Sequence, residues 1–163
     1  MVAAVVATAS AVVIVLLVMR WATGDGRAPT PLGLATTPAA APFGGYREVR
    51  AAVDGRCVRL VVAGTDAEKR AGLRDVDDLG PYAGMLFAES GASDGGFTMA
   101  GVDRPLDITW FASDGARLDA ARMAACPDRG EADCPVYRSR RAYRFALETP
   151  AGAHPATSIT PCM

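Results

Sequence analysis

The sequence predicts a mainly β domain, a compact antiparallel sandwich or jelly-roll-like fold with one short helix, preceded by an N-terminal transmembrane or signal helix. Three observations support this prediction. Short β-branched or alternating runs recur from Cys57 onward, and Gly, Asp and Pro turns separate them. A single segment carries the start signal of a helix. An uncharged apolar stretch opens the chain, which predicts the N-terminal helix.

Residues 1–21 are the predicted signal peptide or membrane anchor. Val2–Val18 contains no charged residue, and about 18 apolar residues is the lower limit for a helix that crosses a bilayer. No Lys or Arg precedes this run, and the small residues after it form a poor cleavage site, which favours an uncleaved anchor over a cleaved signal. A buried core helix is the third interpretation. The positive-inside rule, applied to Arg20 alone, puts this end of the helix in the cytoplasm, whereas the cysteines argue for export.

Residues 22–45 are predicted to be a disordered, Pro- and Ala-rich linker, because they include almost no large apolar side chain to bury. Residues 46–163 then form the predicted β domain, since 163 residues suffice for one domain of ordinary size.

The 17 basic and 18 acidic residues nearly cancel, so we expect no nucleic acid as a partner. The expected partners are the membrane, through the N-terminal helix, and an envelope polymer or small ligand.

Four cysteines in a chain with an export-like N-terminus predict an oxidising compartment and two disulfides. We favour Cys126 with Cys134, which closes a short loop, and Cys57 with Cys162, which fastens the C-terminal tail to the first predicted strand. A metal site is the alternative. It is disfavoured because no CxxC pair is present and the one histidine, His154, lies far in sequence from the short pair Cys126 and Cys134. We therefore expect neither a metal nor a cofactor.

Each element of the domain has a local signal. Thr65 and Glu68 form a capping box that begins a short helix, expected to extend to about Arg74. Asp114 and Gly115 form the tight turn of a hairpin between two of the strands. Alternating and β-branched runs predict strands at residues 57–63, 84–88, 95–99, 106–112, 117–123, 142–148 and 157–162.

A series of short motifs follows these elements in order. The helix carries Arg70, Gly72 and Leu73, and it is followed by GMLF at 84–87, PLDI at 105–108, CPVY at 134–137 and FALETPAG at 145–152. In order and spacing, the chain from about Val58 to Gly152 resembles DUF192, a family of uncharacterised bacterial and archaeal domains. The resemblance implies a compact, mostly β domain of sandwich or jelly-roll character, and it implies no settled activity.

One run departs from the family's pattern. Where the family usually has Phe-Trp-Met-Lys-Asn-Thr before its PLD motif, this chain has FTMAGV at 97–102. Phe97 and Met99 remain, while Thr98, Ala100 and Gly101 stand where Trp, Lys and Asn would be. If those three residues form the family's binding surface, this chain has lost that surface or changed its ligand.

The candidate site surrounds the predicted strand at 106–112. Leu106, Ile108 and Trp110 share one face and are expected in the core, which leaves Asp107 on the opposite face, beside the loop that precedes the strand. The predicted ligand-binding residues are Met99, Arg104, Asp107 and Tyr137.

Asp107 has three candidate roles. Structural pairing with Arg104, Arg122 or Arg144 is favoured, because outward acids on strands are mostly paired or solvated. Ligand binding comes second. Catalysis comes third, since Asp107 and Glu148 are both expected to point away from the core on strands that could be neighbours, and two such carboxylates can hydrolyse a glycosidic bond. No phosphate loop or GxSxG elbow is present.

The sequence thus predicts a membrane-anchored or secreted domain, outside the cytoplasmic membrane, that acts as a non-catalytic binding or accessory module of the cell envelope. An arginine cluster at 138–144 is a further candidate surface for an anionic polymer or headgroup. The alternative functions are a glycan hydrolase that uses Asp107 and Glu148, and a purely structural domain without a ligand.

Overall fold

The computed structural model describes residues 33–152 and 155–162 of the chain. Its main feature is an eight-stranded sheet with the order β1-β2-β3-β4-β9-β6-β7, in which β10 also pairs with β2. The strands of this sheet are β1 (Thr36–Pro38), β2 (Arg47–Val53), β3 (Arg56–Ala63), β4 (Gly84–Ser93), β6 (Leu106–Phe111), β7 (Arg117–Met123), β9 (Tyr143–Pro150) and β10 (Ile159–Pro161). The remaining elements are a two-stranded sheet of β5 (Phe97–Thr98) and β8 (Val136–Tyr137), the helix α1 (Asp66–Ala71) and the 3₁₀ turn η2 (Glu131–Asp133).

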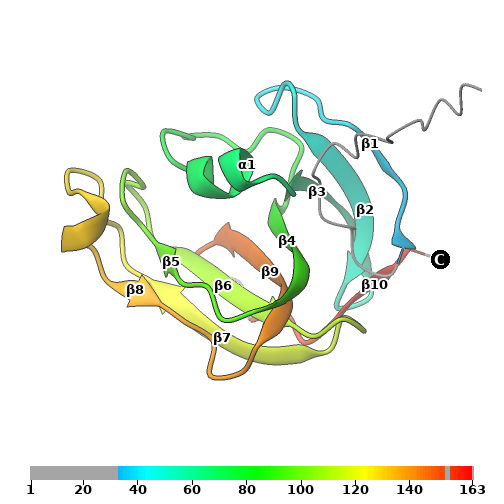
Figure 1. The fold of residues 1–163 in the computed structure, drawn as a ribbon. Helices are drawn as coiled ribbons and strands as arrows, with labels where there is room; N and C mark the ends of the chain where they lie inside the picture. Colours follow the sequence, from blue (N-terminus) through cyan, green and yellow to red (C-terminus); the bar gives the residue numbers. More distant parts are fainter. Residues whose placement is uncertain (1–32, 153–154, 163) are drawn as a thin grey trace, which may run out of the picture.

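The large sheet is mixed and strongly curved (Figure 1). β3 and β4 run parallel, because the connection between them, residues 64–83, contains α1 and is long enough to return the chain to the start of the next strand. The neighbouring pairs β2·β3, β4·β9, β6·β9 and β6·β7 are antiparallel. The prediction of a mainly β fold with little helix is confirmed. The prediction that the strands are all antiparallel is corrected by the parallel pair β3·β4, which makes the eight-stranded sheet mixed.

The C-terminal segment links the two sides of the curved sheet. Ile159 pairs with Val53 on β2, and Ala116, directly before β7, forms a bridge with Ser158. Gly115 has a positive φ of 83°, and a Cβ at this position would lie 2.0 Å from the carbonyl oxygen of Ile159. Glycine is therefore required where the β6–β7 turn meets the C-terminal segment.

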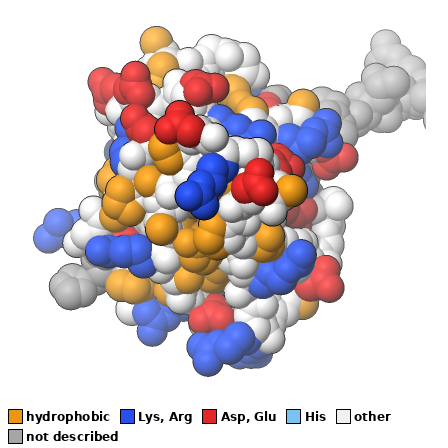
Figure 2. Space-filling view, turned by 90° about the vertical axis from the view of Figure 1, so that its left-hand side faces the viewer, with side chains coloured by type: hydrophobic (Ala, Val, Ile, Leu, Met, Phe, Trp, Pro, Cys, Tyr) orange, Lys and Arg blue, Asp and Glu red, His pale blue; other side chains and the backbone are white. Residues whose placement is uncertain are grey.

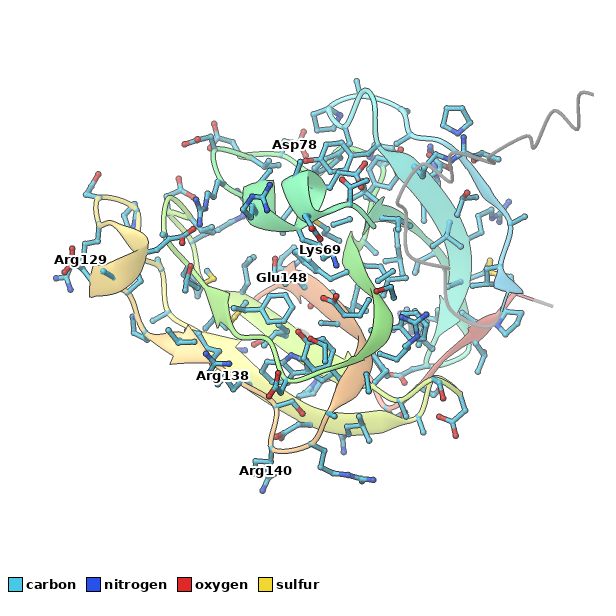
Figure 3. All side chains as sticks on the ribbon, viewed as in Figure 1. Lys69, Asp78, Arg129, Arg138, Arg140 and Glu148 are labelled. Carbon is cyan, nitrogen blue, oxygen red and sulfur yellow. A yellow bond between two sulfur atoms is a disulfide. The ribbon has the colours of Figure 1, made fainter. Side chains whose placement is uncertain are left out.

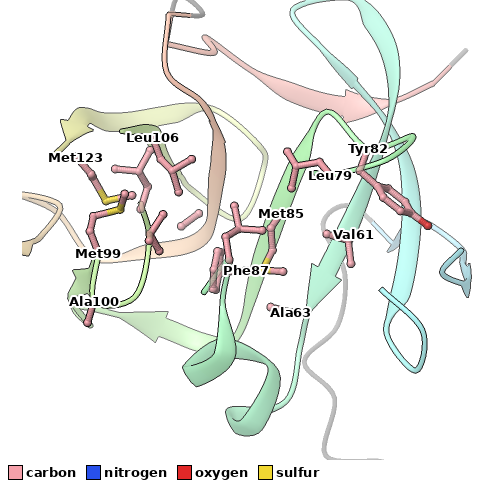
Figure 4. Close-up of a cluster of buried hydrophobic side chains, with 14 of the residues drawn as sticks. Val61, Ala63, Leu79, Tyr82, Met85, Phe87, Met99, Ala100, Leu106 and Met123 are labelled. Carbon is pink, nitrogen blue, oxygen red and sulfur yellow. The ribbon is translucent and has the colours of Figure 1, made fainter. Parts of the chain in front are cut away.

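Two hydrophobic clusters lie on the two faces of the sheet. The first includes Met85, Phe87 and Leu106, and it is covered by α1 and the long connections (Figure 4). The second includes Leu86 and Phe145 and fills the opposite face, which β10 helps to close. Both faces of the central strands are therefore buried, and β6 is buried along its whole length.

The helix α1 begins as predicted. The Thr65 hydroxyl accepts a hydrogen bond from the backbone N–H of Glu68, and the Glu68 carboxylate accepts one from the backbone N–H of Thr65, so the capping box is confirmed. The helix ends at Ala71, before the predicted end near Arg74. Gly72 follows with a φ of +54°, a conformation that glycine adopts most readily.

The folded region extends upstream of the predicted domain boundary. β1 lies within the predicted linker 22–45 and pairs with β2, and Phe43 is buried against the ring of Tyr82. This part of the predicted linker is therefore structured.

The predicted signal or anchor at 1–21 lies outside the described residues. Among the residues described, no helix is long and apolar enough to span a bilayer.

Both predicted disulfides are confirmed. Cys57 is bonded to Cys162, so the end of the chain is fastened to β3. Cys126 is bonded to Cys134 and closes the loop that contains η2.

Among the described residues no group of His, Cys, Asp or Glu side chains has the arrangement of a metal site. His154 lies outside the described residues.

Candidate functional site

A cleft of about 280 Å³ opens beneath α1, against β4, β5 and β9. This volume is just below the range typical of small-molecule pockets, about 300 to 1,000 Å³, so the cleft suits a small ligand. The face that carries β5 and β8 is shown in Figure 2, where apolar side chains gather near the centre with basic and acidic side chains around them. The cleft is lined by residues 69–74, by Phe87 and Glu89, by 95–98 and Val102, and by Glu131, Tyr143 and Glu148.

Glu148 is the most unusual side chain of the cleft. On β9 it lies opposite Met85 of β4 and Ile108 of β6, which places its side chain on the face of the sheet that α1 covers. Figure 3 shows it on the same side of the sheet as Lys69 of α1. The residue is 4% exposed, and nothing in the described part of the chain donates a hydrogen bond or a positive charge to its carboxyl group.

Burial alone therefore determines the protonation of Glu148. A carboxylate in apolar surroundings loses hydration without compensation, so the neutral acid is favoured. Desolvation raises the pKa of Glu148 to about 8. At neutral pH this side chain is mostly a neutral acid, which can donate one hydrogen bond into the cleft.

Four charged residues of the cleft wall form two ion pairs. The Lys69 ammonium lies 2.7 Å from the Glu89 carboxylate of β4 and 3.8 Å from that of Asp66. Arg74, after the helix, forms an ion pair with Glu131 of η2. The Cys126–Cys134 disulfide closes the loop that presents Glu131, so this disulfide supports one wall of the cleft.

Aromatic rings form much of the remaining lining. Phe97 on β5 packs edge-on against Phe87 of β4 with ring centroids 5.0 Å apart, and its ring centroid is 6.0 Å from that of Tyr143. The Tyr143 hydroxyl donates to the carbonyl oxygen of Gly95 at 3.2 Å. Burial raises the pKa of Tyr143 above its ordinary value, so the phenol stays neutral at physiological pH.

The four residues predicted to bind a ligand have other surroundings. Met99 is completely buried in the core, and Arg104 donates to the backbone carbonyl of Asp77 at 2.6 Å. The Tyr137 hydroxyl accepts a hydrogen bond from the backbone N–H of Ala124 at 2.9 Å. Asp107 is buried and faces away from the cleft. None of the four lines the cleft, although their neighbours Phe97, Thr98 and Val102 do.

Asp107 forms the structural pair that the sequence favoured. Its carboxylate accepts two hydrogen bonds from the Arg122 guanidinium, at 2.8 and 3.1 Å, and one from the backbone N–H of Gly152 at 2.9 Å. The Arg122 guanidinium, with the N–H of Gly152, holds the pKa of Asp107 below its usual range. Of the three arginines proposed as partners, Arg122 is the correct one.

The predicted carboxylate pair does not form. β6 and β9 are neighbours, as expected, but the register places Ile108 opposite Glu148 and Asp107 opposite Thr149. Because side chains alternate along a strand, Asp107 and Glu148 lie on opposite faces of the sheet. A hydrolase that uses these two residues together is therefore inconsistent with the fold.

The arginine cluster at 138–144 is partly engaged. Arg140 forms two side-chain hydrogen bonds and one backbone hydrogen bond with Asp119, each 3.0 Å long. Arg138 donates to the carbonyl oxygen of Asp94 at 2.9 Å. Arg140 therefore joins the β8–β9 connection to β7, and Arg138 joins it to the segment between β4 and β5.

Sequence reasoning selected Glu148 and missed the residues that surround it. Lys69 and Glu89 are 20 positions apart, and their contact depends on the β3–α1–β4 crossover, which local periodicity does not reveal. Phe87 was recognised as part of a strand, but nothing in its neighbourhood indicates that it lines a cleft. The one available signal was Glu148, an acid that directly follows the apolar run Phe145, Ala146 and Leu147 in β9.

The fold and the cleft together define the class: a mainly β domain with one curved mixed sheet and a small cleft beneath a short crossover helix. The profile of DUF192, a family described as uncharacterised, matches residues 49–162. The chain therefore belongs to the DUF192 family, which confirms the resemblance seen in the sequence motifs. No curated protein matches the chain.

Two solved structures share the fold. A protein of unknown function from Novosphingobium aromaticivorans has a TM-score of 0.62 and 26% identity, covering 77% of this chain and 93% of that one. A Sinorhizobium meliloti protein, named as a candidate transcription regulator, has a TM-score of 0.59 and 23% identity. The match covers 70% of this chain and 93% of that protein. At 23% identity, the similarity to the Sinorhizobium meliloti protein shows the fold alone.

Proposed function

We propose that this domain is a non-catalytic binding module of the cell envelope that takes a small ligand in the cleft beneath α1. The observation that carries the proposal is Glu148, a buried carboxyl group that faces the cleft without a partner. Buried polar groups in native proteins are nearly always satisfied, and an unsatisfied one in a cleft is a candidate for contact with a ligand.

The composition of the cleft supports binding rather than catalysis. Its second carboxylate near the helix, Glu89, is neutralised by Lys69 at 2.7 Å. Glu131 is likewise paired with Arg74. Acid–base hydrolysis of a glycoside needs one protonated carboxyl group and one free carboxylate facing each other, and these ion pairs occupy the carboxylates that could act with Glu148.

The two disulfides support a location outside the cytoplasm, because such bonds persist mainly in oxidising compartments. The apolar stretch at Val2–Val18 would then be a membrane anchor or an export signal. Intact mass of the protein isolated from its native envelope, with and without reduction before thiol alkylation, tests this part. Two disulfides would support it, and four free thiols would contradict it.

The departure from the family's motif falls in the cleft. Thr98 and Val102, two of the positions where FTMAGV differs from the family's run, both line it. Thr98 stands where the family usually has tryptophan, a much larger side chain that would fill part of the cleft at that position. We infer that its ligand differs from those of family members that retain the tryptophan.

The experiment that tests ligand binding is a screen of small polar fragments by saturation-transfer NMR, with Thr98→Trp as a variant that fills the cleft. Fragments should bind the wild type, and their affinity should fall at least about tenfold in T98W. The matched control is Thr160→Trp, at an exposed position on β10 outside the cleft. Equal binding to wild type and T98W, or no fragment binding at all, would contradict the proposed site.

A further inference from the structure

We propose that the ligand of the cleft is a small organic cation whose ammonium group binds the Glu148 carboxylate. This inference rests on the proposed function and adds the chemical class of the ligand. It stands on three features of the cleft: a buried acid without a partner, four wall residues that form two ion pairs, and a lining of aromatic rings.

The first step concerns charge. Lys69 is paired with Glu89 and Arg74 with Glu131, so these four wall residues present no net charge to a ligand. Glu148 is the acid that remains unpaired among the described residues of the lining. A bound cation would give it the partner that the fold does not provide, which is the condition under which a buried carboxylate becomes stable.

The second step concerns the groups that could favour an anion instead. Arg70 is the one basic residue of the lining that takes no part in these two ion pairs, and it is exposed to solvent. An anion bound there would be solvated and would not contact the buried acid. Lys69 is largely buried but lies against Glu89. The buried part of the cleft is therefore suited to a cation.

The third step concerns the rings. Phe87, Phe97 and Tyr143 line the cleft, and the faces of aromatic rings attract ammonium groups when these are removed from water. Phe97 packs against both other rings, so the three form a continuous aromatic wall. A carboxylate beside aromatic rings offers an ammonium group both a hydrogen-bond acceptor and a favourable surface.

Binding would release a proton. The neutral Glu148 acid transfers its proton to water or buffer, and the carboxylate that remains forms an ion pair with the ammonium group, whose own protons are retained. The other ionisable groups that face this space are Lys69 and Arg70 of α1, Arg74, Glu89 of β4, Glu131 and Tyr143. Met85 and Ile108, which flank Glu148 on the neighbouring strands, do not ionise.

The test uses three probes of similar size and different charge, n-butylamine, n-butanol and butyrate, titrated in phosphate buffer against the full chain by amide NMR. Only n-butylamine should shift the amides of the cleft. Its affinity should rise about tenfold for each pH unit between pH 6 and 7 and level off above pH 8, because one proton leaves as the amine binds. This pH dependence is measured on the wild type and needs no variant.

Glu148→Gln supplies the matched variant, since it keeps the shape of the neutral acid and cannot ionise. It should lose n-butylamine binding and its pH dependence. The control is Asp107→Asn, which alters the other buried acid on the opposite face of the sheet and should leave binding unchanged.

The outcomes separate the two proposals. If n-butanol or butyrate binds the cleft at least as tightly as n-butylamine, or if E148Q retains amine binding, the cation inference is overturned while the ligand-binding function stands. If n-butylamine fails but the fragment screen yields ligands sensitive to T98W, the cation inference alone is again overturned. If neither the probes nor the fragments bind, both proposals fail.

Discussion

Asp107 and Glu148 are two buried acids on adjacent strands with opposite surroundings. Asp107 is 6% exposed and accepts hydrogen bonds from Arg122 and Gly152, which lower its pKa. Glu148 is 4% exposed and has no partner in the described residues, and burial raises its pKa. Two acids of similarly low exposure therefore form a structural ion pair on one face of the sheet and a neutral acid at a cleft on the other.

The difference shows that partners, and not burial alone, determine what a buried acid does. On the face of Asp107 the strand register places Arg122 of β7 directly across from the carboxylate. On the face of Glu148 the residues directly across on the neighbouring strands are Met85 and Ile108, which cannot form an ion pair with it. A satisfied acid strengthens the fold, whereas an unsatisfied one leaves a binding capacity that a ligand can use.

The largest expected effect separates the two acids by pH. The pKa of Glu148 is raised in the folded protein from its ordinary value of 4.5 to about 8, so the folded state holds this proton more tightly than the unfolded state. Its contribution to stability is therefore greatest below pH 4.5 and declines as the pH rises toward 8, by up to about 1.4 kcal/mol per pH unit. Urea unfolding of the wild type and Glu148→Gln across this range measures it.

In that experiment the difference in unfolding free energy between the two proteins isolates Glu148 from other titrating groups. The free energy of unfolding of E148Q should rise steadily relative to that of the wild type as the pH rises. Asp107 has the opposite sign, because its pKa is lowered: its contribution is present above its ordinary value of 3.8 and is lost as the pH falls below it. A constant difference between wild type and E148Q from pH 5 to 8 would contradict the account of Glu148.

The second effect concerns Asp107 itself. Asp107→Ala should lower the free energy of unfolding by about 2 to 3 kcal/mol at pH 7, because charge-assisted hydrogen bonds to Arg122 and Gly152 are lost. Chemical denaturation checks the value, with Asp103→Ala, an exposed acid in the loop before β6, as a control for loss of charge. A change below about 0.5 kcal/mol would mean that the Asp107 pair is only a surface ion pair.

The smallest effect would make Glu148 more like Asp107. Glu89→Gln removes the carboxylate that holds Lys69 at 2.7 Å, which leaves an ammonium group in the cleft without its main partner. The pKa of Glu148 should then fall, and carbon NMR of the carboxyl group measures it. Asp66→Asn is the control, since Asp66 is 3.8 Å from Lys69 and its side chain is 86% exposed. An unchanged pKa in E89Q would show that Lys69 does not act on Glu148.

Local signals in the sequence predicted the elements, and long-range packing determined what they bury. The capping box at Thr65 and both disulfides were predicted correctly because each depends on a few residues. β2, Arg47–Val53, was missed because charged residues interrupt its apolar pattern, and β1 was missed because its segment is rich in Pro and Ala.

The candidate site was predicted less well for the same reason. Alternation along β6 correctly separated Asp107 from Leu106 and Ile108, but it could not show that both faces of the strand are buried. Glu148 was expected to point outward, and instead it lies under the β3–α1–β4 crossover. Only the three-dimensional path of the crossover shows that this face of the sheet is covered.

The most direct test of the central claim is a carbon-detected NMR titration of the Asp107 and Glu148 carboxyl groups in the wild-type protein. The account predicts that Glu148 is mostly protonated at pH 7 and titrates near pH 8, while Asp107 stays ionised to below its ordinary value of 3.8. If both carboxyl groups are fully ionised at pH 7, Glu148 has a partner or is hydrated, and the account of an unsatisfied acid at the cleft is contradicted.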